Sequence, residues 1–367
     1  MDSDLFSKIE FQLSNKLPFV VYRKPKKSII TAILQHDNQL RRIEDYSEVG
    51  FVLAPFDSQP QAYYIQPDEI LQEAVGPTSV RVQNTTTVHE DYVLKQNHIE
   101  LVKKGIDAIE TGDFEKVVLS RSIRVECSRA PLELFKTLMY KYDSALKYLW
   151  YHPKLGMWLG ATPEILLRVD NNRFTTMSLA GTRPFNQGTQ VNWGQKEKVE
   201  QKLVTNYISN ALKNVVANLE ISKTETVRAG NLWHLRTKLS GTLNDNLAEV
   251  VAALHPTPAV CGLPLKPAKD FILENEKYDR SFYTGFLGEL NLKIAQDRTS
   301  DRKNVENKAY RSFRSVTEFF VNLRCAQLHT ESVTVYVGGG ITKDSIPELE
   351  WDETVAKSAT ILSIIVP

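Results

Sequence analysis

Residues 114–121 have the sequence FEKVVLSR, which places one lysine at the start of a β-branched run. The segment 117–119 (VVL) predicts a strand that is buried on both faces, inside a layered protein. Side chains alternate along a strand, so Lys116 points to the same face as Ser120. A lysine on a buried face must reach water at the strand end, find an acidic partner, or give up its proton.

The composition is that of a soluble globular enzyme, with 367 residues, 42% hydrophobic, 24% charged and a net charge of +1. This balance gives no electrostatic reason to expect binding to nucleic acid or to a membrane surface. Three isolated cysteines without a CxxC pair favour neither a disulfide framework nor a zinc site. The chain starts without a signal-peptide pattern, and no apolar run approaches the ~20 residues that span a bilayer. We therefore expect a cytoplasmic protein.

Helices and strands are predicted along the whole chain, without a clean domain boundary. The basic run RKPKK (23–27) and the polar stretch 291–314 predict a solvated loop and an exposed insertion between two strands, respectively. The apolar patterns predict helices over 92–113, 131–142 and 194–220, strands at 146–151, 155–160, 164–169 and 332–340, and a final helix after them.

The helix predicted at 194–220 carries acidic residues on the face that should be buried. Projected back along the apolar stripe, Glu197 and Glu200 fall on the core side. They either favour the positive end of the helix dipole or point into a site. The stripe itself consists of Val204, Ile208, Leu212, Val215 and Leu219.

A second acidic pair opens the last helix, for which Ser345 is the expected N-cap and Pro347 lies close to the first helical position. Glu350 and Glu353 share one face with Lys357, so Glu353 and Lys357 could simply form a surface ion pair worth ~0.3–0.5 kcal/mol. Two inward-facing ExxE pairs would instead make an all-oxygen site for a hard divalent cation such as Mg²⁺.

Other single positions leave two readings open. Glu164 follows a proline and precedes an apolar run, so it is either a strand-entry carboxylate in water or a buried acid with a raised pKa. Gly338–Gly340 end a strand, and their N–H groups could hold a carboxylate or phosphate. Neither a GxGxxG nor a Walker loop is present, so nucleotide binding is unsupported. His234 and His255 are more typical of core or turn positions than of catalysts.

Nine motifs in order resemble those of the chorismate-utilising enzymes, from about residue 95 to the end. The resemblance implies one α/β (α+β) domain over 1–367, with two large, mostly antiparallel sheets packed together and helices outside. Residues 1–92 match loosely, and 93–367 carry the motifs. These are KVVLSR, LGATPE, LAGTRP, KEKVEQKLV, HLRTKLSG, LHPTPAVCGLP, RSFYTGFLGEL, NLRCAQL and GGGITKDSIPELEWDETVAK.

The chain is most similar to the members that convert chorismate to isochorismate, by water attack at ring C2 and loss of the C4 hydroxyl. By this match, Lys116 takes the proton from water and Glu164 protonates the leaving hydroxyl. Burial should lower the pKa of Lys116 and raise that of Glu164, because neither free group suits its role at pH 7.

The resemblance also implies Mg²⁺, with Glu200 and Glu353 as direct ligands and Glu197 and Glu350 in support through water. It implies chorismate as the small-molecule partner, no glutaminase subunit, and a monomer or weak homodimer. The matching substrate-binding positions are Gly181, Thr182, His234, Ala259, Tyr283, Arg324, Gly338, Gly339, Gly340 and Lys357.

Several positions depart from family patterns. Ala180 replaces the nucleophilic lysine of aminodeoxychorismate synthases, and Ala259 replaces a threonine usual in salicylate and anthranilate synthases. Gln201 replaces the family histidine, and the long polar stretch 291–314 loosens the register at Arg324. A salicylate-forming enzyme, an ammonia-using synthase and a non-catalytic homologue stay open as alternatives. Menaquinone and siderophore synthesis are both possible uses of the product.

Overall fold

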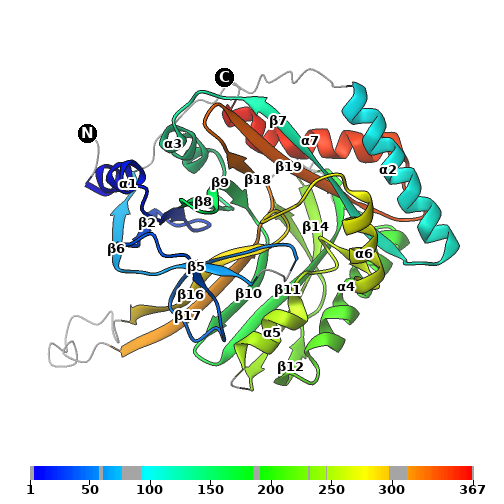
Figure 1. The fold of residues 1–367 in the computed structure, drawn as a ribbon. Helices are drawn as coiled ribbons and strands as arrows, with labels where there is room; N and C mark the ends of the chain where they lie inside the picture. Colours follow the sequence, from blue (N-terminus) through cyan, green and yellow to red (C-terminus); the bar gives the residue numbers. More distant parts are fainter. Residues whose placement is uncertain are drawn as a thin grey trace.

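The computed structural model describes residues 4–57, 61–76, 92–184, 191–229, 232–244, 246–296 and 312–365. Within these residues the chain forms two large antiparallel sheets and seven helices (Figure 1). This confirms the predicted α+β architecture of two packed sheets with helices outside.

The first sheet contains the lysine strand close to one edge. Residues 116–126 form β7, which pairs with β19 along its whole length and with the short edge strand β15. The order across this sheet is β15 (Gly262–Leu263), β7 (Lys116–Glu126), β19 (Ser332–Ile341), β18 (Cys325–Leu328), β9 (Gly156–Thr162), β8 (Leu146–His152), β1 (Phe19–Arg23), β2 (Ile29–Leu34) and β6 (Glu69–Ala74).

The second sheet is drawn from both halves of the chain, and β13 (Glu225–Ala229) pairs with β14 beside it. Strands from the first 76 residues thus lie in both sheets. The order across this sheet is β12 (Val216–Ile221), β14 (Leu232–Leu243), β11 (Arg173–Pro184), β10 (Ile165–Asp170), β17 (Ser312–Val321), β16 (Phe286–Gln296), β4 (Gly50–Ala54), β5 (Tyr63–Ile65) and β3 (Arg41–Arg42).

Large aromatic side chains fill the space between the two sheets. Trp150 and Trp158 from the first sheet meet Phe51 and Phe320 from the second, and none of the four is more than 1% exposed. Alternation along each strand sends every second side chain to this core and the others to the outer faces. The segment 117–119 is buried as predicted.

Helices cover the outer faces, and Figure 1 shows α2 beside α7 and α4 beside α5. Helices α1, α3 and α7 pack on the first sheet, α4 and α5 on the second, and α2 and α6 against β7. Their bounds are α1 (Asp4–Ser14), α2 (Tyr92–Thr111), α3 (Pro131–Lys141), α4 (Gln195–Leu212), α5 (Leu247–Leu254), α6 (Leu265–Asn275) and α7 (Pro347–Ile365).

The predicted helix over 194–220 is confirmed to Leu212 and wrong over 213–220. Helix α4 ends at Leu212, and residues 216–221 form β12 instead. The β-branched Val215 and Val216 favour strand over helix, and pairing with β14 provides backbone partners at the sheet edge. Val215 and Leu219 still pack in the expected core. The apolar positions were therefore correctly identified, but they were assigned to a helix where the chain forms a strand.

Three smaller predictions also need correction. In the basic run 23–27, Lys24 points inward and bridges two acidic side chains of the second sheet. Of the predicted insertion, 291–296 and 312–314 belong to β16 and β17, and 297–311 lie outside the described residues. Ser345 does not cap α7, because its hydroxyl accepts from the Thr342 N–H and the helix begins at Pro347.

No helix in the described part of the chain is long and apolar enough to cross a bilayer.

Candidate active site

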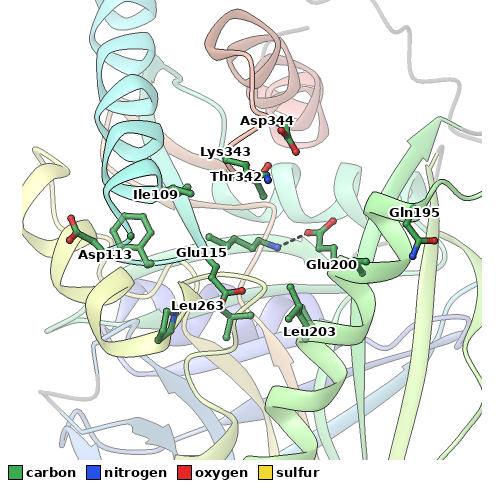
Figure 2. Close-up of a pocket in the computed structure, with 16 residues that line it drawn as sticks. Ile109, Asp113, Glu115, Gln195, Glu200, Leu203, Leu263, Thr342, Lys343 and Asp344 are labelled. Atoms are coloured by element: carbon green, nitrogen blue, oxygen red, sulfur yellow. Dashed lines mark hydrogen bonds and ion pairs between the residues drawn. The ribbon is translucent and has the colours of Figure 1, made fainter.

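Lys116 is the first residue of β7, and only 12% of its side chain is exposed. Its Nζ lies 2.7 Å from Oε1 of Glu200 on α4, the contact drawn as a dashed line in Figure 2. Gly340 on the neighbouring strand leaves room for the lysine, because an added Cβ would stand 3.1 Å from Lys116 Cε. Of the three options open to an inward lysine, the structure shows an ion pair.

Glu164 lies where the chain passes from β9 in the first sheet to β10 in the second. Burial raises the pKa of Glu164 to about 7, and the positive charges of Lys116, Lys357 and Arg324 limit that rise. The direction agrees with the sequence prediction. At neutral pH, therefore, a large fraction of this carboxyl group is protonated and able to act as an acid.

Glu197, one turn before Glu200 in α4, has a different partner. Arg183 donates to Glu197 Oε1 from Nη2 at 2.6 Å and from Nε at 2.8 Å. Burial acts to raise the pKa of Glu197, but the hydrogen bonds from Arg183 hold it below its ordinary value. This carboxylate is thus charged and held by an arginine at the end of β11.

The first turns of α7 lie directly on β19. Glu353 pairs with Lys357 at 2.5 Å, and Lys357 Nζ also donates to the Gly338 carbonyl at 2.9 Å. A Cβ added to Gly339 would lie 3.4 Å from Glu350 Oε2 and 3.8 Å from Glu353 Oε1. The expected i, i+4 ion pair is therefore present, and both carboxylates also face the glycine strand.

Two adjacent glycines of β19 lie against Lys116 and against the acidic pair of α7, on opposite faces of the strand. Gly340 lies against Lys116, whose ammonium holds Glu200, while Gly339 lies against the acidic pair of α7. The predicted carboxylates of α4 and α7 thus approach the same end of β19, although they are some 150 residues apart in sequence.

The described residues contain no group of three or more acidic, histidine or cysteine side chains close enough to hold a metal ion as they stand. Glu197, Glu200 and Glu353 pair with cationic side chains instead. The donor set nevertheless fits a hard divalent cation, because carboxylate oxygens on two neighbouring helix starts are the ligands that Mg²⁺ prefers.

Arg324 supplies positive charge beside Glu164. It has φ 49, and its Nη1 donates to the Lys357 carbonyl at 3.1 Å and to Thr360 Oγ1 at 3.4 Å. Burial lowers the pKa of the guanidinium, and the nearby Tyr283 and acidic groups act in the opposite direction. A buried guanidinium next to a lysine is a suitable receptor for a substrate carboxylate.

Tyr283 and His234 both lie close enough to Arg324 for electrostatic interaction. Tyr283 stacks on Tyr336 with ring centroids 5.5 Å apart, and its hydroxyl packs on Gly338, where a Cβ would stand 3.0 Å away. His234 Nδ1 lies 3.2 Å from the Gly181 carbonyl. Burial lowers the pKa of His234, and nearby cationic groups add to this effect.

The remaining predicted binding residues lie on β11 and in the turn before β15. Gly181, at φ +68, sits at an irregularity in the β11–β14 pairing, next to Thr182, whose side chain lies outside the described residues. Ala259 is partly buried in the turn before β15, and β15 pairs Leu263 with Lys116.

A pocket of about 670 Å³ opens on one side of the Lys116–Glu200 ion pair (Figure 2). Its walls come from α2, α4 and the segments that precede α6 and α7, and they include the apolar side chains of Ile109, Leu203 and Leu263. Lys116 and Glu200 both line this pocket, and Glu164 is not part of the lining.

Comparison with known proteins identifies the family. A model of the family described as "Chorismate binding enzyme" matches residues 57–295, and a second model, "chorismate binding enzyme", matches 309–363. The chain belongs to the chorismate binding enzyme family.

Several proteins similar to the chain are isochorismate synthases by name. Isochorismate synthase DhbC of Bacillus subtilis is 28% identical over 343 residues, which cover 84% of this chain and 78% of the relative. Isochorismate synthase EntC of Escherichia coli is 28% identical over 353 residues, covering 91% and 84%. The solved structure of MenF, the menaquinone-specific isochorismate synthase from Escherichia coli, superposes with a TM-score of 0.76 at 20% identity, covering 95% and 88%.

Two ion pairs in this chorismate binding enzyme were not predicted from the sequence. Arg183 stands within the quoted motif LAGTRP, but nothing in its spacing indicates that it reaches Glu197 on α4. Arg280 and Glu276 also form a buried ion pair at 2.6 Å. Glu276 fixes β7 as well, because it accepts hydrogen bonds from both the N–H and the hydroxyl of Ser120. Only the three-dimensional packing brings these groups together.

Proposed function

We propose that the protein is an isochorismate synthase that converts chorismate reversibly to isochorismate in the presence of Mg²⁺. The names of relatives that match most of the chain support this reaction. The observation that supports the proposal is that an inward lysine lies close enough to a carboxyl group with a pKa near 7 for its charge to act on that pKa.

In the proposed reaction, Lys116 removes a proton from a water molecule whose oxygen attacks ring C2. The double bonds of the ring shift, and the C4 hydroxyl leaves as water after Glu164 gives it a proton. One water molecule is consumed at C2 and one is released from C4. Lys116 takes up one proton and Glu164 gives one, so atoms and protons balance. Glu164 is well suited to the acid step because its carboxyl group is partly protonated at pH 7.

Positive charge for the dianionic substrate comes from Arg324 and Lys357, which both lie close enough to Glu164 to affect its pKa. We expect Arg324 to bind the enolpyruvyl carboxylate together with Tyr283 and the backbone of Gly338–Gly340. Gly181, Thr182, His234 and Ala259 line the adjacent strands and turns and would complete the pocket.

Glu200 and Glu353 would hold Mg²⁺ directly, with Glu197 and Glu350 in support. The cation would offset the charge of the ring carboxylate. Since Glu200 and Glu353 pair with lysines in this structure, these carboxylates must exchange partners when the cation binds.

The test is to incubate the purified protein with chorismate and Mg²⁺ and to separate the products by chromatography. We expect a mixture of chorismate and isochorismate, and product formation about 10²–10⁴-fold slower from Lys116→Ala. Formation of salicylate with pyruvate would favour the salicylate-forming alternative, against which Ala259 argues. An inert substrate would contradict both.

A further inference from the structure

One buried amide fastens α4 to the second sheet. Gln201 is 2% exposed, and its Nε2 lies 3.1 Å from the Ser178 carbonyl, 2.8 Å from Ser178 Oγ and 3.0 Å from Thr237 Oγ1. Ser178 and Thr237 are directly paired across β11 and β14. The side chain therefore contacts two neighbouring strands of the sheet at once.

The hydroxyl groups around the amide nitrogen are linked to one another, whereas the amide oxygen Oε1 is buried without a hydrogen-bond partner among the described residues. Ser178 Oγ lies 2.7 Å from Thr205 Oγ1, which also donates to the Gln201 carbonyl at 2.8 Å. Thr237 Oγ1 lies 2.8 Å from Thr224 Oγ1 on the exposed side. Buried polar groups with several partners favour one geometry, because a displaced amide would leave donors and acceptors unpaired.

The apolar contacts of α4 define its position less sharply. Val204, Ile208 and Leu212 pack at 1%, 2% and 0% exposure, but apolar packing has no direction. Gln201 directly follows Glu200, and one residue of slippage would move the helix by about 1.5 Å and rotate it by about 100°. Such a shift would remove the Glu200 carboxylate from Lys116.

We propose that Gln201 is a positioning residue. Its amide sets the register of α4 on β11 and β14 and so holds the Glu200 carboxylate at Lys116. Where it concerns Mg²⁺ affinity, this inference rests on the proposed function, while its other part concerns only the ion pair of Lys116 and Glu200.

The first experiment uses metal-free protein. Gln201→Met keeps the length of the side chain and removes its hydrogen bonds, and Thr224→Val is the matched control that cuts the same network away from the amide. Each protein is treated with a water-soluble acetylating reagent at one pH, and the modification rate of Lys116 is measured by peptide mass spectrometry. Lys343 at the pocket provides the internal reference.

We expect Lys116 to react several-fold faster in Gln201→Met and at the original rate in Thr224→Val, because only the former releases Glu200. Equal rates in all three folded proteins would overturn the proposal. If Gln201→Met does not fold, Gln201→His retains one N–H donor and serves as the milder variant, with a smaller increase expected.

The second experiment measures Mg²⁺ binding by titration calorimetry. Loss of a group that orients a ligand costs about 10–100-fold in metal affinity, so Gln201→Met should weaken binding by this factor. Turnover at saturating Mg²⁺ should change far less. A purely structural role would lower the melting temperature and leave the affinity unchanged. If the unmodified protein binds no Mg²⁺, the metal part of the proposed function fails, and the acetylation rates still decide the role of Gln201.

Discussion

At the residue scale, Glu164 is a carboxyl group poised between its two protonation states. Burial raises its pKa to about 7, whereas the three cationic neighbours prevent a larger rise. An acid is most effective when its pKa is close to the working pH. The charge around Glu164 therefore matters as much as its burial.

The pH dependence of turnover should show this group. If Glu164 acts as the acid, the rate should fall as pH rises through about 7, because the protonated form is lost. Glu164→Gln should reduce the rate by about 10²–10⁴-fold and remove this alkaline limb. Steady-state rates from pH 5.5 to 9 test both statements. A variant that retains the limb would assign it to another group.

Lys116 can be tested separately from Glu164. Lys116→Ala should lower turnover by about 10²–10⁴-fold, because no other base replaces it, while chorismate still binds. Substrate affinity measured by fluorescence quenching serves as the control for an intact site. Near-normal turnover would show that the inward lysine is not the base.

Lys147 is another inward lysine, but unlike Lys116 it forms no ion pair with any residue that the structure describes. Its side chain is fully buried on β8, and within the described residues its Nζ has no hydrogen-bond partner. Burial lowers the pKa of Lys147 to about 8, the charge of Arg23 adds to this effect, and Asp143 opposes it. An unpaired buried ammonium is costly, and no step of the proposed reaction uses it.

Lys147→Met should therefore stabilise the protein at neutral pH, by on the order of 1–3 kcal/mol. The folded pKa of about 8 lies below the unfolded value of 10.5, so the penalty is fully present below pH 8 and disappears as pH rises toward 10.5. The gain in free energy of unfolding should shrink over the same window. Denaturant unfolding at pH 7 and pH 10 measures it, and a gain that is equal at both pH values would contradict this explanation.

At the scale of elements, β19 shows how one strand serves both folding and the site. A Cβ on Gly338 would stand 2.7 Å from the Leu119 carbonyl, a backbone atom that cannot yield easily. A Cβ on Gly340 would instead meet the flexible end of Lys116 at 3.1 Å. Neighbouring glycines of one strand therefore have different reasons for lacking a side chain.

The two alanine variants should separate these reasons. Gly338→Ala should destabilise the fold by about 1–3 kcal/mol through overpacking. Gly340→Ala should change stability by less and reduce turnover at least tenfold, because it displaces Lys116. Melting temperatures and rates measured on both proteins provide the comparison. Equal losses of stability would mean that Lys116 cannot move aside.

The predictable part of these elements was their periodic part. The strand at 117–119, the helix at 92–113 and the acidic face of α4 followed from alternation and apolar spacing. The end of α4 did not, because Val215 and Leu219 fit a helical stripe and a strand equally well. Pairing with β14 decides between helix and strand, and this partner cannot be identified from the local sequence.

At the scale of the whole molecule, the site exists because two sheets and two helices meet at β19. Glu164 and Lys116 could be predicted from motifs, as could the carboxylates of the two ExxE pairs. The Glu353–Lys357 ion pair followed from its i, i+4 spacing, but two other cationic partners could not be predicted. Lys116 and Glu200 are 84 residues apart, and nothing in the sequence shows that Arg183, only 14 residues before Glu197, contacts α4. The charge balance of the site is a property of the packing.

Metal removal should act on this assembly as a unit. Chelation should abolish turnover and Mg²⁺ should restore it, because substrate carboxylates and inward glutamates repel one another without a cation. Glu200→Gln and Glu353→Gln should each weaken Mg²⁺ binding while the circular dichroism spectrum is retained. Full activity in excess chelator would remove Mg²⁺ from the account.

The most direct test of the central claim follows the oxygen of water. The protein is incubated with chorismate and Mg²⁺ in water enriched in ¹⁸O, and the products are analysed by mass spectrometry. Water attack at C2 predicts isochorismate that carries one ¹⁸O atom, without stoichiometric pyruvate. Unlabelled isochorismate, or salicylate accompanied by an equal amount of pyruvate, would contradict the proposed reaction.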